Sequence, residues 1–255
     1  MVGAATACLL TKQGLRVALV DSHPLAQWHP GKYSPRVSAV NLASCRIFRW
    51  LDVWQGIEKR RISAYDAMHV WEHQSSASIS FNALEMGQPH LGYIIENSAI
   101  VSALAEKLAQ NYNVDIVGNA TLQSRSEKGD NLELQLDNGQ TMQCRLLVGA
   151  DGASSRTRDI SAIDSRISDY GQDAIVTTVT IAGNHANTAW QCFLPTGPIA
   201  MLPLSDGKCS IVWSCDREFG EQVMSLDKKA FCRKLSTCFE SQLGKITGCG
   251  KRLSF

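Results

Sequence analysis

The sequence predicts a mixed α/β fold in two parts, one built on a parallel sheet and the other on a mainly antiparallel sheet. An Ala- and Leu-rich stretch at residues 2–13 is followed by Gly14 and the apolar run 15–20, the order expected of a helix, its C-cap and a strand. A second apolar run, 146–148, leads into Gly149-Ala150-Asp151-Gly152. Beyond residue 169, stretches with strand patterning follow one another. Together these observations favour an α/β part followed by a β-rich part.

The N-terminal helix and strand read as the second half of a βαβ unit, so we expect the first strand and its glycine-rich turn to lie before Met1. In the dinucleotide fingerprint G-x-G-x-x-G, Gly3 matches the last glycine, which allows close packing of helix on strand. Asp21 ends the strand, where the fingerprint has the acidic residue that binds a ribose. Many strands end in Asp, so this match alone is a weak signal.

The turn at residues 149–152 suits a nucleotide phosphate. Residues 146–148 are predicted to be a buried strand, and Gly149 and Gly152 permit backbone geometry that a Cβ obstructs. Asp151 offers a carboxylate to ribose hydroxyls or ordered water. Hydroxyl and guanidinium donors follow at a predicted helix start, at Ser154, Ser155, Arg156 and Arg158. A purely structural turn uses the same glycines, and the four residues do not separate the two interpretations.

A second candidate for cofactor binding lies at residues 34–41, which we interpret as a polar loop that passes into a helix at 41–51. The planar fork of Arg36 suits a pyrophosphate, although a solvated loop cation is an equal alternative. Residues 67–72 and 78–81 predict a hairpin. Residues 92–97 predict a strand that leads into a helix at 98–111, capped by Asn97 or Ser98.

In the second half, residues 114–117, 132–136 and 143–148 predict a strand meander with polar turns at 128–130 and 137–139. Four strands are then expected at 174–181, 189–193, 199–204 and 209–214, followed by a helix at 228–240. We therefore predict a cofactor-binding domain at residues 1–166 and a substrate domain at 167–255, with residues 63–89 joining the substrate sheet.

Composition excludes several classes of protein. A formal net charge of +1 argues against a basic face for nucleic acid, and no apolar run approaches the length of a membrane helix. We expect a soluble, cytoplasmic protein. Nine cysteines without a C-x-x-C pair predict reduced structural thiols and no metal site.

No catalytic residue stands out. His69, His73 and His90 have no spaced partner, which favours surface or hydrogen-bonded structural histidines. Six large apolar residues alternate with polar ones on the expected strands and either face a lipid-like substrate or pack in the core, with packing the preferred interpretation. They are Tyr170, Trp190, Phe193, Met201, Leu202 and Trp213.

Several motifs together closely resemble the FAD-dependent hydroxylases of ubiquinone biosynthesis, and the resemblance spans the whole chain. They lie at residues 1–5, 36–41, 92–97, 149–153 and 195–198. Within that family, residues 61–65, 69–72 and 210–214 look most like the VisC-type 2-polyprenylphenol hydroxylase.

The resemblance implies a flavoprotein monooxygenase with the aromatic-hydroxylase fold, a Rossmann-like FAD domain plus a substrate sheet. In that family NAD(P)H reduces FAD, and a flavin C4a-hydroperoxide hydroxylates a polyprenylated phenol. The same resemblance allows membership of a quinone-synthesis enzyme complex and peripheral association with the inner membrane. By the family pattern the cofactor contacts are Gly3, Asp21, Arg36, Asn97, Asp151, Gly152 and Arg158. Ser154 and Arg156 depart from the pattern, which more often has Asn and an apolar residue there.

Two family segments are not found in these 255 residues: the initial strand with two fingerprint glycines, and a later Gly-Asp segment. We therefore expect a fold that is incomplete at both ends, FAD binding that is weak or absent, and no turnover by this chain alone. Three alternatives remain open. They are a nicotinamide dehydrogenase with a Rossmann domain, a related ubiquinone hydroxylase acting at another ring carbon, and a non-catalytic partner in a quinone-synthesis assembly.

Overall fold

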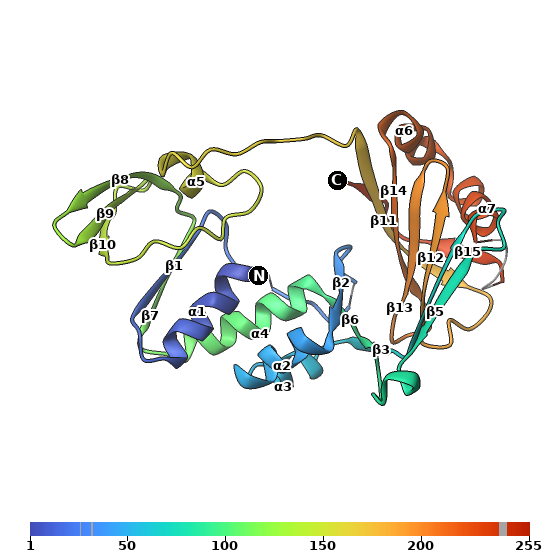
Figure 1. Cartoon of the computed structure of the whole chain (residues 1–255), viewed down its shortest axis with the longest axis horizontal. Coiled ribbons are helices and arrows are strands. Elements are labelled where there is room, and N and C mark those ends of the chain that lie inside the picture. Colours follow the sequence, from blue (N-terminus) through green and yellow to red (C-terminus); the bar gives the residue numbers. More distant parts are fainter. Residues whose placement is uncertain (26, 32, 240–243) are drawn as a thin grey trace. The chain divides into compact units, whose positions relative to one another are not determined.

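A computed structural model describes residues 1–25, 27–31, 33–239 and 244–255. The chain divides into two compact units, each described here by itself (Figure 1). Unit 1 comprises residues 1–28, 50–54 and 100–168, and unit 2 comprises residues 29–49, 55–99 and 169–255. The predicted division at residue 166 lies near the last of these boundaries, but the functional domains themselves stay a prediction. None of the helices among the described residues has the length and apolar character needed to cross a bilayer.

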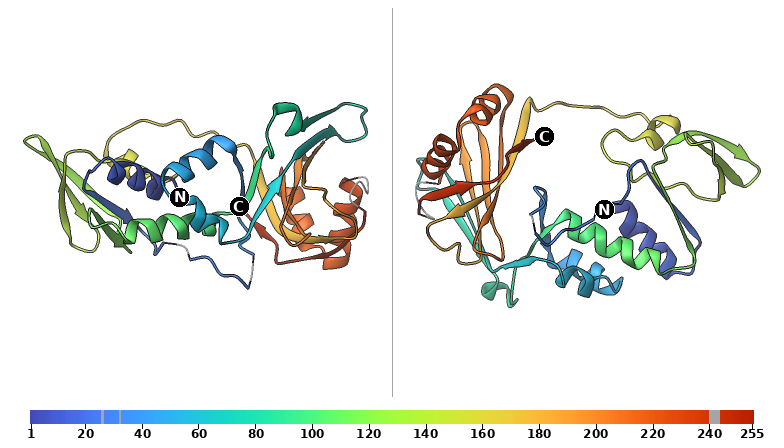
Figure 2. Two further views of the ribbon diagram at one scale, coloured as in Figure 1. Left: turned by 90° about the horizontal axis from the view of Figure 1, so that it is seen from below. Right: turned by 180° about the vertical axis from the view of Figure 1, so that it is seen from behind.

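Unit 1 is built on a short parallel sheet. Helix α1 (Val2–Lys12) ends before Gly14, whose φ of +79° reverses the chain into β1 (Val17–Asp21). β1 pairs in parallel with β7 (Val114–Gly118), which follows helix α4 (Asn97–Ala109). α1 and α4 lie side by side (Figure 2), and the Cys8 thiol points at the Leu104 carbonyl, 3.9 Å away. This confirms the predicted helix-then-strand order.

A three-stranded antiparallel meander completes unit 1 with the short helix α5 (Arg156–Ile160). Its strands are β8 (Leu122–Lys128), β9 (Asn131–Leu136) and β10 (Thr141–Cys144). Its apolar side chains form a small core with Val20 of β1 and Ile160 of α5. The meander therefore anchors the segment that leads from β10 into residues 149–152.

Unit 2 contains a three-stranded antiparallel sheet in the order β2 (Val37–Asn41), β6 (Gly92–Glu96), β3 (Ile62–Tyr65). Helix α2 (Leu42–Trp50) follows β2 directly, and α3 (Trp54–Glu58) precedes β3. Cys45 and Phe48 are the buried residues of α2. The sheet brings the ends of β2 and β6 together, with Val37 opposite Glu96.

The larger sheet of unit 2 has the order β15-β11-β14-β13-β12-β4-β5, and β16 also pairs with β11. The hairpin β4 (Ala67–Glu72) and β5 (Ser78–Asn82) joins this sheet through β4, which pairs in parallel with β12. The 3-10 turn η1 (Leu84–Met86) follows β5. The remaining strands are β11 (Gln172–Ile181), β12 (Thr188–Leu194), β13 (Gly197–Pro203), β14 (Cys209–Asp216), β15 (Ile246–Cys249) and β16 (Leu253–Ser254).

The main core of unit 2 lies between this sheet and two helices, α6 (Arg217–Ser225) and α7 (Lys228–Cys238), on one face of it (Figures 1 and 2). Met201 and Trp213 are fully buried there, which confirms the packing interpretation for both. Tyr170 is 91% exposed and so belongs to neither the core nor an enclosed pocket.

Three sequence expectations about elements were wrong. Residues 146–148 form no strand, because no strand among the described residues pairs with them, and Leu146 is 70% exposed. Residues 37–41, expected to pass from a loop into a helix, form strand β2 instead, since they pair with β6. β7 does not belong to the meander, where the unpredicted β8 takes its place. The predicted end of the last helix, Glu240, lies outside the described residues.

Candidate cofactor site

The first turn of α1 and the end of β1 lie at the same edge of unit 1. A Cβ placed on Gly3 would stand 3.6 Å from Cδ1 of Leu19, two residues before Asp21. Met1 is the N-cap of α1, with no side-chain cap and no acidic residue in the first turn. Among the residues that the structure describes, no side chain caps the first amide groups of α1, and a helix start of this kind suits an anion. The Asp21 carboxylate accepts a hydrogen bond from the His23 amide at 3.0 Å.

The turn at residues 149–152 lies next to α1. A Cβ on Gly3 would stand 3.4 Å from the Cβ of Ala150, so a larger residue at position 3 would press on this turn. A Cβ on Gly149 would lie only 3.1 Å from Cγ2 of Thr157. Gly152 has φ of +86° and open space around its Cα. The two glycines thus serve the purposes predicted for them, close approach and a left-handed backbone.

The Asp151 carboxylate is hydrogen-bonded to residues at the start of α5. Its carboxylate accepts hydrogen bonds from the Ser155 hydroxyl and from the Thr157 amide, the latter at 2.9 Å. Burial acts to raise the pKa of Asp151, but these hydrogen bonds outweigh it and the pKa lies below its usual 3.8. The stability that Asp151 contributes is therefore present above pH 3.8 and is lost as the pH falls through its lower folded pKa.

The sequence indicated Ser155 only as a possible hydrogen-bond donor to an anion. In the structure Ser155 also has a structural role. Its hydroxyl caps α5 by accepting a hydrogen bond from the Arg158 amide at 3.0 Å. The Arg158 guanidinium donates to the Ala153 carbonyl at 3.0 Å, so it folds back over the same turn. A serine directly before a short helix was the sequence signal for this cap.

Replacing Ser155 with alanine is expected to lower the free energy of unfolding by about 1 kcal/mol, the usual cost of losing an N-cap. The Asp151 carboxylate also loses a donor, and amide exchange at Thr157 and Arg158 should accelerate. Urea unfolding and hydrogen exchange measure both effects. Ser161→Ala, just after the same helix, is the control. Equal effects of the two substitutions would contradict the capping role.

Arg36 and Asn97 come together in unit 2. The Asn97 amide donates to the Arg36 carbonyl at 3.0 Å, and the Ser38 hydroxyl donates to Oδ1 of Asn97 at 2.6 Å. The Arg36 side chain is exposed and stands 5.3 Å from the centroid of the Phe255 ring. Pairing of β2 with β6 therefore places the backbone of Arg36, whose side chain is exposed, next to Asn97, as neither local sequence could show alone.

The seven predicted cofactor residues thus fall into two groups. Gly3, Asp21, Asp151, Gly152 and Arg158 belong to unit 1, whereas Arg36 and Asn97 belong to unit 2. Their roles in binding stay predictions.

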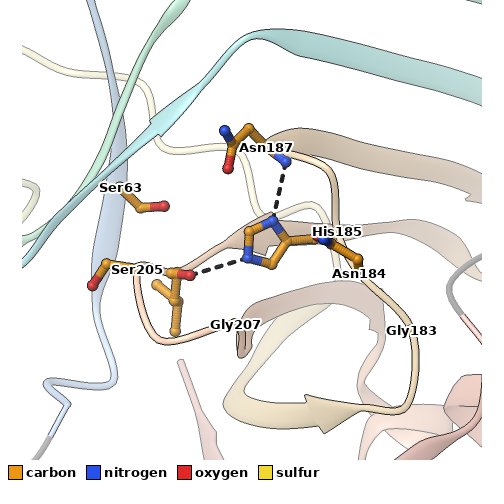
Figure 3. Close-up of a pocket in the computed structure, with 8 residues that line it drawn as sticks. Ser63, Gly183, Asn184, His185, Asn187, Ser205 and Gly207 are labelled. Atoms are coloured by element: carbon orange, nitrogen blue, oxygen red, sulfur yellow. Dashed lines mark hydrogen bonds between the residues drawn. The ribbon is translucent and has the colours of Figure 1, made fainter.

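A cavity of about 390 Å³ lies in unit 2, between the β11–β12 connection and the β13–β14 turn (Figure 3). His185 is buried at its wall. Nδ1 of His185 accepts from the Asn187 amide at 3.1 Å, so Nε2 carries the proton and donates to the Leu204 carbonyl, also at 3.1 Å. Both ring nitrogens are therefore engaged in hydrogen bonds to the backbone, which indicates a structural role for His185.

His69 and His90, both predicted to be surface or hydrogen-bonded structural histidines, fit that interpretation. His69 stacks on Trp71 with ring centroids 5.4 Å apart, and its Nδ1 lies 2.8 Å from the Ser80 hydroxyl. His90 pairs through Nδ1 with Asp66. Both lie in the β4–β5 region of unit 2 or beside it, held by neighbouring side chains.

Unit 1 fits the adenosine and pyrophosphate end of FAD. A helix start without a side-chain cap, an acidic residue at the end of the adjacent strand and a glycine turn packed on that helix start are the features that a bound dinucleotide needs. Gly3 and Gly152 themselves contribute no Cβ atoms to this surface. The arrangement suits the binding of a dinucleotide.

Comparison with known proteins supports this assignment. Residues 1–243 match the family described as FAD binding domain. The ubiquinone biosynthesis monooxygenase COQ6 of Danio rerio is 34% identical over 94% of this chain and 53% of its own length. The 3-demethoxyubiquinol 3-hydroxylase of Escherichia coli is 29% identical over 97% of this chain and 63% of its own length. The chain therefore spans somewhat more than half the length of these relatives.

Solved structures agree on the fold. A variant of Pseudomonas aeruginosa PqsL has a TM-score of 0.80 at 19% identity and covers 100% of this chain and 70% of its own. The p-nitrophenol 4-monooxygenase PnpA of Pseudomonas putida has a TM-score of 0.73 at 16% identity, over 100% of this chain and 65% of its own. These matches confirm the predicted aromatic-hydroxylase type of fold. The sequence match over residues 1–243 establishes that the chain belongs to the family described as FAD binding domain.

Proposed function

We propose that this protein is an FAD-dependent monooxygenase that hydroxylates the aromatic ring of a polyprenylated phenol in ubiquinone biosynthesis. The observation that supports this proposal most strongly is sequence similarity. This chain is 29–35% identical, over at least 94% of its length, to proteins named as ubiquinone-pathway monooxygenases and hydroxylases. Membership of the FAD-binding family also argues against the alternative that the protein is a nicotinamide dehydrogenase. Assignment to the VisC type and the ring carbon attacked stay part of the proposal.

In this proposal the chain's own residues bind and orient the cofactor. The first turn of α1 at Gly3 faces the pyrophosphate, and the Asp21 carboxylate accepts hydrogen bonds from the adenosine ribose. The turn at Asp151 and Gly152, braced by Arg158, lies beside that helix start. In unit 2, Arg36 and Asn97 supply further cofactor contacts. FAD, reduced by NAD(P)H, would supply the dioxygen chemistry.

The substrate in this proposal is a lipophilic quinone precursor. Such a substrate suggests access from a membrane surface or from another enzyme of the same pathway, so peripheral membrane association and a quinone-synthesis complex both belong to the proposal. The mainly antiparallel sheet of unit 2 is the proposed substrate domain, with β4 and β5 as its additional edge.

Deleting the gene in its host and analysing the quinone pool tests the pathway assignment. We expect a polyprenylated intermediate that lacks one ring hydroxyl to accumulate, and its structure identifies the carbon attacked. Re-expression from a plasmid should restore the normal pool. An unchanged quinone profile in the deletion strain would contradict the proposal.

Asp21→Ala tests the cofactor site directly. Loss of a carboxylate that accepts ribose hydrogen bonds is expected to weaken the binding of both FAD and ADP by about tenfold, since a charged hydrogen bond contributes about 1.5 kcal/mol or more. Titration calorimetry of the 255-residue protein measures both ligands. Asp130→Ala, in the exposed β8–β9 turn of the same unit, is the matched control. Identical affinities for wild type and Asp21→Ala would exclude the ribose contact.

A further inference from the structure

Glu96 is a buried carboxylate beside the proposed cofactor residues. It is the last residue of β6, directly before Asn97, and is 2% exposed. Oε1 of Glu96 accepts from Nε of Arg61 at 3.1 Å and lies 3.0 Å from Nη2 of the same guanidinium. Burying a carboxylate is costly unless hydrogen bonds and an opposite charge compensate for it, so this pair must hold its neighbourhood in a defined geometry.

The Glu96–Arg61 ion pair binds the chain segment that precedes β2. The Ser34 amide donates to Oε2 of Glu96. Arg61 donates to the carbonyls of Pro30 at 3.0 Å and His29 at 3.2 Å. Its guanidinium also lies 4.0 Å from the centroid of the Tyr33 ring. The backbone groups of His29, Pro30 and Ser34 and the ring of Tyr33 thus all contact the same ion pair.

This segment leads directly to Arg36. Only Pro35 lies between Ser34, whose amide donates to Glu96, and Arg36, whose carbonyl accepts from the Asn97 amide at 3.0 Å. Glu96 is the last residue of β6 and Asn97 is the first residue of α4, so two successive residues bind both ends of the short segment 34–36. The side chain of Arg36 projects from a backbone that is fixed on either side.

We propose that Glu96 and Arg61 are positioning residues, which order residues 33–36 and hold Arg36 ready for the anionic pyrophosphate of the cofactor. This inference rests on the proposed FAD-dependent function. Its physical basis is preorganisation, because a segment that is already ordered loses less conformational entropy when an anion binds. The planar fork of Arg61 makes several bonds at once, which a lysine cannot reproduce.

Glu96→Gln is the principal test, since it keeps the side-chain volume and removes the charge. In the 255-residue protein we expect faster hydrogen exchange at the Ser34 amide and about tenfold weaker FAD binding. Arg61→Lys is a second, milder variant that keeps the charge and loses the fork. Glu133→Gln is the matched control, because Glu133 forms an ion pair with Lys128 on the exposed surface of unit 1.

A double-mutant cycle with Arg36→Ala separates positioning from general damage. If Glu96 acts through Arg36, Glu96→Gln should weaken FAD binding no further once Arg36 is alanine. Additive losses would overturn the positioning role, as would unchanged exchange at Ser34. If wild-type protein bound neither FAD nor ADP, the cofactor contacts proposed for this chain would fall and the ligand assigned to Arg36 with them. Unchanged exchange with intact FAD binding would overturn the positioning role alone.

Discussion

Replacing Gly197 with alanine is expected to lower the free energy of unfolding of unit 2 by about 4 kcal/mol, through backbone strain and steric overlap together. Gly197 opens β13 after a tight turn and has φ of +125°, a conformation that alanine rarely adopts. A Cβ there would also lie 2.4 Å from the Ser214 carbonyl oxygen on β14. That atom belongs to the backbone of a central strand, so it cannot move aside without disturbing the β13–β14 ladder.

Gly207→Ala provides the control for this substitution. Gly207 also has positive φ, +79°, but nothing lies within 4 Å of a Cβ placed on it. Its replacement should therefore cost only the conformational strain, about 1 kcal/mol. Urea unfolding of both variants, followed by tryptophan fluorescence, measures the difference in midpoint. Similar losses from the two substitutions would show that overlap with Ser214 does not contribute.

Local patterns in the sequence predicted the elements whose apolar residues repeat regularly. The strands β11 to β14, the β4–β5 hairpin and helix α1 all appear where their periodicity placed them, with ends that differ by at most two residues. Gly14 and Gly152 were also interpreted correctly, because a left-handed backbone is a local property that glycine signals by itself.

Errors arose where structure depends on a distant partner. Strand β2 exists because β6, more than 50 residues later, supplies its hydrogen bonds. Residues 146–148 have the composition of a strand, yet no described strand lies beside them to complete a ladder. Strand formation requires a neighbour as well as a suitable sequence, and only the neighbour distinguishes these two segments.

Prediction of the candidate site from the sequence is limited in the same way, because side-chain contacts depend on distant partners. Asp151 was selected for its carboxylate, but hydrogen bonds from Ser155 and Thr157 give it a local structural task that the motif alone did not reveal. Glu96 and Arg61 were not singled out as a pair, since 35 residues separate them and a charged residue is usually exposed. Burial in the folded chain makes Glu96 informative, and burial is decided by the tertiary structure.

Arg61→Ala is expected to lower the free energy of unfolding by about 3 kcal/mol, because it removes a charge partner from a carboxylate that is 2% exposed. The segment around His29 and Pro30 loses its guanidinium donor in the same step. Lys128→Ala removes a cation from Glu133 at a similar ion-pair distance, 2.9 Å, but the Lys128 side chain is 64% exposed, so the expected loss of stability is much smaller.

Chemical denaturation of wild type and the two variants measures this contrast at low and high salt. Raising the salt concentration should reduce the small effect of Lys128→Ala and leave that of Arg61→Ala nearly unchanged, since salt screens exposed charges much more than buried ones. If both substitutions cost the same and respond alike to salt, the Arg61–Glu96 pair is solvated in solution. A solvated pair would order residues 29–31 and 33–34 no more than an ordinary surface ion pair does. Arg36 would then become ordered only when the cofactor binds.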